Sequence, residues 1–238
     1  LALYNRAFST QAIFTGTFFS VFSGVTFPVF VQMQDDNERL ILNIRKFLIV
    51  ITMLIFSVMS TLIVLANPLF EFLYSSKWDG AIPFFQLACI SGMITPLISI
   101  MESIILAKGF SGKFLIISIV RKCFVVVALF VAWHFGITWL IVGQIIVNIC
   151  ELSLYLFYIK RIVGFGISNL LNDITPYFII AIIVAFNVFV CNFALKLATS
   201  SVISGMTLSC IELLLGSIVA TLTLFLVNRT FKTRGYFE

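Results

Sequence analysis

The side chains best suited to chemistry in this sequence are the ionisable residues that interrupt long apolar stretches. Five residues fit this description: Glu102, Arg121, Lys122, Glu151 and Glu212. A charged group at the centre of a bilayer costs about 2.5–3.5 kcal/mol on insertion scales, so such groups normally face a partner or a water-filled cavity. These five residues are therefore the first candidates for a functional site.

Polar residues at helical spacing accompany Glu151. Gln144, Asn148, Glu151, Tyr155 and Tyr158 are separated by four, three, four and three residues, which places them on one face of a helix. We expect this face to be wet or paired with another helix. Weaker versions of the pattern occur in two other apolar stretches, as Ser91, Thr95, Ser99 and Glu102, and as Ser209, Glu212 and Gly216.

The basic pair and Glu151 have matching depths. At a rise of 1.5 Å per residue, Arg121 and Lys122 lie about 10 Å into the stretch 114–133, and Glu151 lies about 12 Å from the same end of the next, antiparallel stretch. An ion pair is therefore available between Glu151 and either basic residue. The pair either neutralises itself within a helix bundle, or lines a cavity where Arg suits the geometry of a phosphate or pyrophosphate. Snorkelling of the basic residues to phosphate headgroups is a third interpretation.

The elements that position these residues follow from composition. The chain has 238 residues, of which 61% are hydrophobic and 11% are charged. A soluble domain is typically about 45–50% apolar and about 25% charged. Runs of about 20 apolar residues recur along the chain, as membrane-spanning helices require. The sequence predicts an all-α, polytopic transmembrane bundle with seven spans at 11–31, 47–67, 83–107, 114–133, 138–159, 174–195 and 203–227.

The loops between these spans predict the orientation, because cytoplasmic loops carry the excess of Lys and Arg. If the first span runs from outside to inside, ten basic residues lie inside and three outside, so the C-terminus is cytoplasmic. The inside set is Arg39, Arg45, Lys46, Lys108, Lys113, Lys160, Arg161, Arg229, Lys232 and Arg234, and the outside set is Arg6, Lys77 and Lys196.

The most polar stretch, "FPVFVQMQDDNERL" at 27–40, is predicted to be a cytoplasmic hairpin between the first two spans. Its acids precede the second helix, where the helix dipole favours them. The net charge of +5 follows from the basic residues spread over several loops, which gives no reason to expect a nucleic-acid partner.

Motifs for bond-making chemistry are absent from the sequence. It contains no phosphate-binding glycine loop, no His-Glu metal motif and no nucleophile elbow, and the spacing of its five cysteines fits no metal site. We therefore expect no metal, no cofactor and no enzymatic activity. The chain begins "LALYNRAF", without an initiating Met or a signal peptide, so we expect a fragment whose beginning is missing.

Several loop motifs resemble a known family. "YNRAF" (4–8), "FPVFVQMQDDNERL" (27–40), "LANPLFEFLYSSKWDGAIPFFQL" (65–87) and "ILAKG" (105–109) resemble, in that order, the second half of Wzx-type polysaccharide flippases. This family, which includes O-antigen exporters, belongs to the multidrug/oligosaccharidyl-lipid/polysaccharide exporter superfamily. One departure is visible, since Ser75 and Ser76 stand before "KW" where the family pattern leads us to expect a glycine.

The resemblance implies two helical lobes around a cavity that opens alternately to each side of the bacterial cytoplasmic membrane. It implies about twelve to fourteen spans in the full chain, with 1–173 forming the second lobe and 174–238 a terminal helix pair and cytoplasmic tail. The implied substrate is a polyprenyl-pyrophosphate-linked oligosaccharide. Membrane lipids and polysaccharide assembly proteins are the other implied partners.

On this interpretation the cavity wall carries Arg121, Lys122, Glu151, Gln144 and Asn148. The basic residues would offset the pyrophosphate charge, and the amides would bind sugars. Glu212, nearest mid-depth, is a candidate site for a coupling cation or proton. Rival hypotheses are a drug or peptidoglycan-precursor exporter of the same superfamily, a membrane-embedded polymerase or glycosyltransferase, and a scaffold for polysaccharide assembly. The predicted outer loops are short, which disfavours the polymerase.

Overall fold

The computed structural model describes residues 1–199 and 205–232, and every regular element within these ranges is a helix. This confirms the all-α prediction. The elements are α1 (Ala2–Gln32), α2 (Asn37–Val64), α3 (Ala66–Tyr74), the 3-10 helix η1 (Ser76–Ala81), α4 (Ile82–Ala107), α5 (Ser111–Phe135), α6 (Ile137–Ile162), α7 (Ile167–Thr199) and α8 (Gly205–Lys232).

Among the described residues, five helical segments are long and apolar enough to cross a membrane, namely 37–64, 77–107, 111–135, 137–162 and 167–195. They overlap the second to sixth predicted spans. Helices α1 and α8, of 31 and 28 residues, overlap the first and seventh. At 1.5 Å per residue both exceed the hydrocarbon thickness of about 30 Å, although seven crossings remain a prediction. The predicted residues 203 and 204 lie outside the described ranges.

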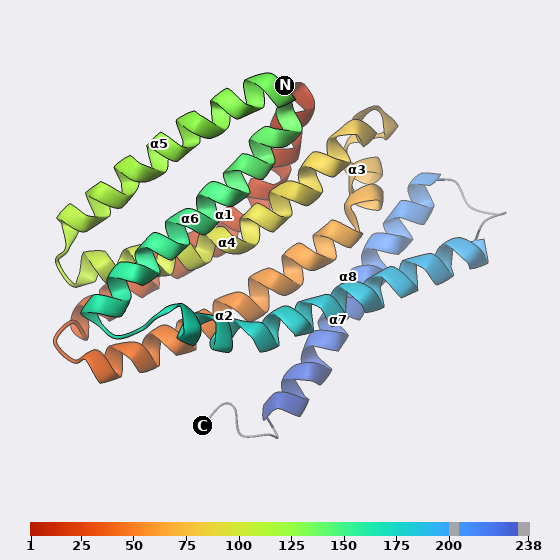
Figure 1. Ribbon diagram of the computed structural model, residues 1–238. Helices are drawn as coiled ribbons and strands as arrows, with labels where there is room; N and C mark the ends of the chain where they lie inside the picture. Colours follow the sequence, from red (N-terminus) through yellow and green to blue (C-terminus); the bar gives the residue numbers. More distant parts are fainter. Residues whose placement is uncertain (200–204, 233–238) are drawn as a thin grey trace.

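The long helices form a bundle in which α4 is central (Figure 1). Helix α4 packs against α1, α2 and α6, while α5 packs mainly against α6. Helices α7 and α8 pack against each other, and α7 covers α2. A main core of buried apolar side chains joins α1, α2, α4 and α6, and a smaller one joins α7 and α8 to the end of α2. The predicted boundary at 173/174 falls within α7 and remains a prediction.

The polar stretch that follows α1 forms the predicted hairpin, but its loop is short. Only residues 33–36 separate α1 from α2, because Asp36 caps the second helix by accepting a hydrogen bond from the backbone N–H of Arg39 at 3.0 Å. Glu38 lies in the first turn of α2. The second helix therefore starts ten residues before the apolar span predicted at 47.

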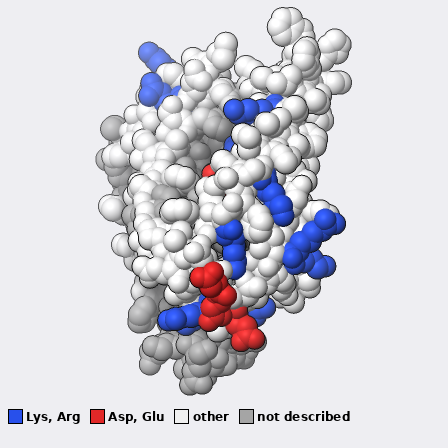
Figure 2. All heavy atoms as spheres, turned by 90° about the vertical axis from the view of Figure 1, so that its left-hand side faces the viewer, with Lys and Arg blue, Asp and Glu red and all other residues white. Residues whose placement is uncertain are grey.

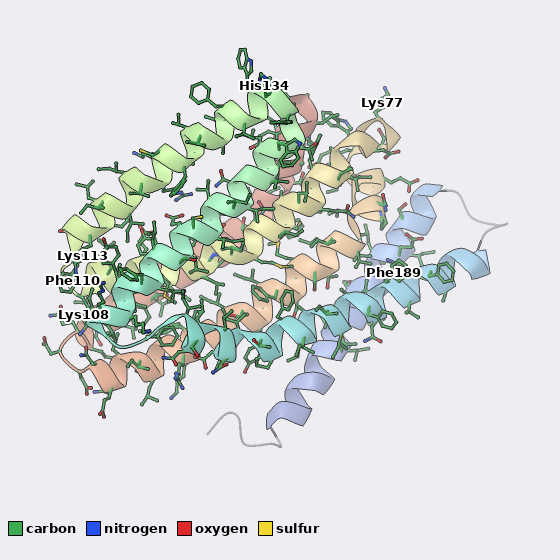
Figure 3. The ribbon with its side chains drawn as sticks, in the orientation of Figure 1. Lys77, Lys108, Phe110, Lys113, His134 and Phe189 are labelled. Carbon is green, nitrogen blue, oxygen red and sulfur yellow. The ribbon has the colours of Figure 1, made fainter. Side chains whose placement is uncertain are left out.

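The basic loop residues gather at two ends of the bundle. Lys108 and Lys113 lie at the end where α1 turns into α2, whereas Lys77 and His134 lie at the opposite end (Figure 3). Viewed toward the first end, Lys and Arg side chains surround a compact group of Asp and Glu (Figure 2). The helices thus place the predicted inner and outer loops at opposite ends.

Candidate functional site

The polar face predicted on α6 packs against α4. Asn148, Glu151 and Tyr155 are buried, at 3%, 4% and 1% exposure. The amide of Asn148 donates a hydrogen bond to the Ser91 hydroxyl of α4 at 3.0 Å, and accepts one from the Gln144 amide at 3.1 Å. The weaker polar pattern of α4 thus meets the stronger pattern of α6 through the hydrogen bond between Asn148 and Ser91.

The predicted ion pair forms between Arg121 of α5 and Glu151 of α6. The Nε of Arg121 lies 3.2 Å from Oε2 of Glu151, and its Nη1 donates to Oε1 at 3.4 Å. Gly143 allows the two helices to approach, since a Cβ atom there would lie 2.9 Å from the Cβ of Ala128. Two contacts from one guanidinium to one carboxylate fix the direction of the Arg121 side chain.

The two partners differ strongly in exposure. The Glu151 side chain is 4% exposed, whereas the Arg121 side chain is 44% exposed. The carboxylate is therefore enclosed by α4, α5 and α6, while the Arg121 side chain is only about half covered. An Arg that is anchored from behind in this way keeps N–H donors available for an external anion.

Glu102 of α4 adds a second carboxyl group to this region. It lies close enough to Arg121 and Glu151 to interact electrostatically with both, and the Tyr155 hydroxyl interacts with the Ser118 side chain of α5. We call Glu102, Ser118, Arg121, Glu151 and Tyr155 the polar cluster. The sequence identified Glu102 as a membrane-depth acid but did not group it with the pair, because helical spacing gives no information about which helices become neighbours.

Two of the predicted site residues lie apart from both the ion pair and the hydrogen-bonded amides of α6. Lys122 is exposed on α5, about 100° around the helix from Arg121, and makes no ion pair or hydrogen bond with the described residues. Glu212 is buried at 3% exposure on α8, a helix that packs against α2, α3 and α7. The structure therefore brings together Arg121, Glu151, Gln144 and Asn148, and separates Lys122 and Glu212 from them.

The loop motifs make contacts at both ends of α1. Near its start, the Arg6 guanidinium lies 4.8 Å from the ring centre of Tyr74 and 4.9 Å from that of Trp78. Beyond its other end, the Lys108 ammonium donates to the backbone carbonyl of Gln34 and to Oδ1 of Asn37. Charged side chains from one motif therefore contact residues of another motif.

Comparisons with known proteins agree with these motifs. Residues 1–83 match a family described as "Polysaccharide biosynthesis protein". The chain is 29% identical over 106 residues to "Lipopolysaccharide biosynthesis protein WzxC" of Escherichia coli strain K12, which covers 44% of this chain and 22% of that protein. It is 25% identical over 227 residues to "Uncharacterized membrane protein in cps region" of Klebsiella pneumoniae, covering 94% and 45% of the two chains.

The chain thus spans less than half the length of the curated relatives it matches. No solved structure is significantly similar to it.

Proposed function

We propose, from the similarity of this chain to Wzx-type polysaccharide flippases, that its protein moves a polyprenyl-pyrophosphate-linked oligosaccharide across the cytoplasmic membrane. The names of the relatives refer to lipopolysaccharide biosynthesis and to a cps region, which supports a role in the export of surface polysaccharide. Membrane lipids and polysaccharide assembly proteins would be its other partners.

The observation that carries this proposal is the half-exposed Arg121 anchored by a buried Glu151. An unpaired guanidinium would be costly in a bilayer, and a fully buried pair would have no access to substrate. Arg121 is fixed by a buried carboxylate through Nε and Nη1, and its other N–H donors would be free to bind a pyrophosphate. Lys122, exposed on the next residue, would add a second positive charge.

Gln144 continues this surface along α6, and Asn148, which is buried at 3% exposure, supports it from within the bundle. Gln144 is only partly buried, and its amide is held in place by the hydrogen bond to Asn148. Amides both donate and accept hydrogen bonds, so the Gln144 amide suits the hydroxyls of an oligosaccharide, and we propose that Asn148 contributes to the site by holding Gln144. Glu151 would act mainly by positioning Arg121, and Glu212 remains our proposal for a coupling-ion site in the separate α8 region.

The proposed orientation places the Lys108 end of the bundle and the C-terminus in the cytoplasm, following the excess of basic loop residues at that end. The polar cluster would then be reached from the inner side first, where a lipid-linked oligosaccharide is assembled before it is moved.

Genetic complementation of the complete gene tests the proposal. The gene is deleted and restored as wild type, as Arg121→Ala plus Lys122→Ala, or as the control Arg39→Ala plus Lys46→Ala, which removes the same charges from the exposed start of α2. Deletion should accumulate lipid-linked oligosaccharide inside the cell and reduce surface polysaccharide. The first double variant should do likewise at normal membrane abundance, and the control should export.

Unchanged surface polysaccharide after deletion would refute the proposed function. Altered resistance to drugs or to inhibitors of peptidoglycan synthesis would then favour the rival exporters. Normal export by the Arg121→Ala plus Lys122→Ala variant would instead show that the basic residues are structural.

A further inference from the structure

A separate polar cavity lies at the other end of the bundle from Lys108. It has a volume of about 570 Å³ and is lined by Asn67, Glu71, Asp79, Ile82, Pro83 and Gln86. Small-molecule sites typically occupy about 300–1,000 Å³, so the cavity has the size of a ligand site. All six lining residues come from the motif at 65–87, where α3, η1 and the start of α4 meet.

Two of the polar side chains that line the cavity are held in place from outside it. Oε2 of Glu71 accepts a hydrogen bond from the Ser209 hydroxyl of α8 at 2.7 Å, and the Gln86 amide donates to the backbone carbonyl of Ile63 at 3.1 Å. These hydrogen bonds use Oε2 of Glu71 and the amide nitrogen of Gln86, so one side-chain oxygen of each residue remains available as an acceptor. Oε1 of Glu71 and the Asp79 carboxylate make no hydrogen bond with the part of the chain that the structure describes.

The wall of the cavity is also braced. Asp79 belongs to η1, and the neighbouring Trp78 packs with Tyr74 against Arg6 of α1. Because these aromatic contacts connect η1 to α3 and α1, less conformational freedom is lost when a ligand binds. The backbone of the cavity wall is therefore pre-organised, and the Glu71 and Asp79 carboxylates lie on it beside an apolar edge at Ile82 and Pro83.

We propose that this cavity binds the hydroxyl groups of a neutral or amino sugar, as a carbohydrate subsite on the outer side of the membrane. Carboxylates accept strong hydrogen bonds from sugar hydroxyls, and the Asn67 and Gln86 amides both donate and accept. The apolar edge suits the C–H face of a sugar ring. This inference rests on the proposed function, since the exported oligosaccharide would supply the sugar.

Other ligand classes fit the cavity less well. Two carboxylates repel phosphate and acidic sugars, and four polar lining side chains disfavour an apolar ligand. A calcium ion takes six to eight oxygens within about 2.6 Å, whereas no cluster of three or more His, Cys, Asp or Glu side chains suited to a metal occurs among the described residues. At about 30 Å³ per water molecule, the cavity volume of about 570 Å³ equals that of roughly nineteen waters, which is far more than one ion needs.

Saturation-transfer NMR on the complete protein tests this assignment. The protein is placed in phospholipid nanodiscs, so that no sugar-based detergent competes, and is exposed to methyl glucoside or methyl glucuronide. These probes differ only in the carboxylate at C6. We expect millimolar binding of the glucoside and binding of the glucuronide weaker by about tenfold or more, because Glu71 and Asp79 repel its charge.

The variant Glu71→Gln plus Asp79→Asn keeps the shape of both side chains and removes both charges. It should bind the glucoside about tenfold more weakly and lose the discrimination against glucuronide. The control Asp35→Asn plus Glu38→Gln makes the same two chemical changes in the α1–α2 region and should behave as wild type. Melting temperatures of both variants would show whether they remain folded.

Equal binding of the two probes, glucoside binding that the cavity variant leaves unchanged, or calcium binding in place of sugar would overturn the carbohydrate assignment. Export of polysaccharide is measured separately by complementation. Sugar binding without an export defect in the deletion strain would refute the proposed function and retain the cavity, whereas export without sugar binding would refute only the cavity.

Discussion

The ion pair between Arg121 and Glu151 predicts an asymmetric response to mutation. Arg121→Met leaves the Glu151 side chain, which is 4% exposed, without its partner, whereas Glu151→Gln leaves the Arg121 side chain, which is 44% exposed. Removing one partner of a buried pair costs about 3–5 kcal/mol, while exposed pairs contribute about 0.2–1 kcal/mol. We expect a loss of about 3 kcal/mol of stability for Arg121→Met and about 1 kcal/mol for Glu151→Gln.

The double variant Arg121→Met plus Glu151→Gln separates a structural role from a functional one. Replacing both members of a buried pair is often nearly neutral, so its stability should return to within about 1 kcal/mol of wild type. The remaining loss comes from Glu102, which keeps its carboxyl group but loses the neighbouring guanidinium. If Arg121 binds substrate, the double variant is folded but does not export.

Two measurements on the same four proteins check this reasoning. Thermal unfolding in nanodiscs gives the order of stabilities, and complementation of the deletion strain gives export. Equal melting temperatures for Arg121→Met and wild type would refute the ion pair as a stabilising contact. A double variant that exports normally would refute the role of Arg121 in binding substrate, and the pair would then be structural.

Three further predictions concern the framework. Asp36→Ala should lower stability by about 1 kcal/mol in thermal unfolding, because α2 loses its capping hydrogen bond. Ser75→Gly should raise the melting temperature, since Ser75 has φ 65° and ψ 168°, a region that costs a residue with a side chain about 1–3 kcal/mol; an unchanged melting temperature would contradict this backbone conformation. In intact cells, an impermeant maleimide should label Lys77→Cys but not Asp35→Cys, and the reverse pattern would overturn the proposed orientation.

The long helices were predictable because the hydropathy of a stretch depends only on the residues within it, and a run of about 20 apolar residues predicts a membrane-spanning helix. The predicted span 83–107 corresponds to α4 at Ile82–Ala107 within one residue. The helical ends were less predictable, since α2 and α7 extend into polar sequence where hydropathy falls but helical hydrogen bonding continues. Helix α3 and η1 were missed, because a nine-residue helix beside an apolar span does not produce a separate hydropathy peak.

The candidate site was predictable only in part, for a geometric reason. Periodicity placed Gln144, Asn148 and Glu151 on one face of α6, and their contacts with α4 and α5 agree with this. It could not choose between Arg121 and Lys122, because adjacent residues point about 100° apart and the rotation of α5 depends on packing. Hydropathy also could not place Glu102 beside Arg121 and Glu151. That placement requires knowledge of which helices pack against one another.

The match to the family model and the proposed substrate site lie in different parts of the chain. The family match covers residues 1–83, whereas Arg121 and Glu151 lie beyond it. The motif residues Arg6 and Lys108 contact other motifs at the ends of α1, where they stabilise the packing of helices. A defect caused by Arg6→Ala would therefore report on the fold, while a folded Arg121 variant that fails to export would report on the substrate. Because these motif contacts lie apart from the polar cluster, the similarity to polysaccharide biosynthesis proteins would stand even if the polar cluster proved to be structural.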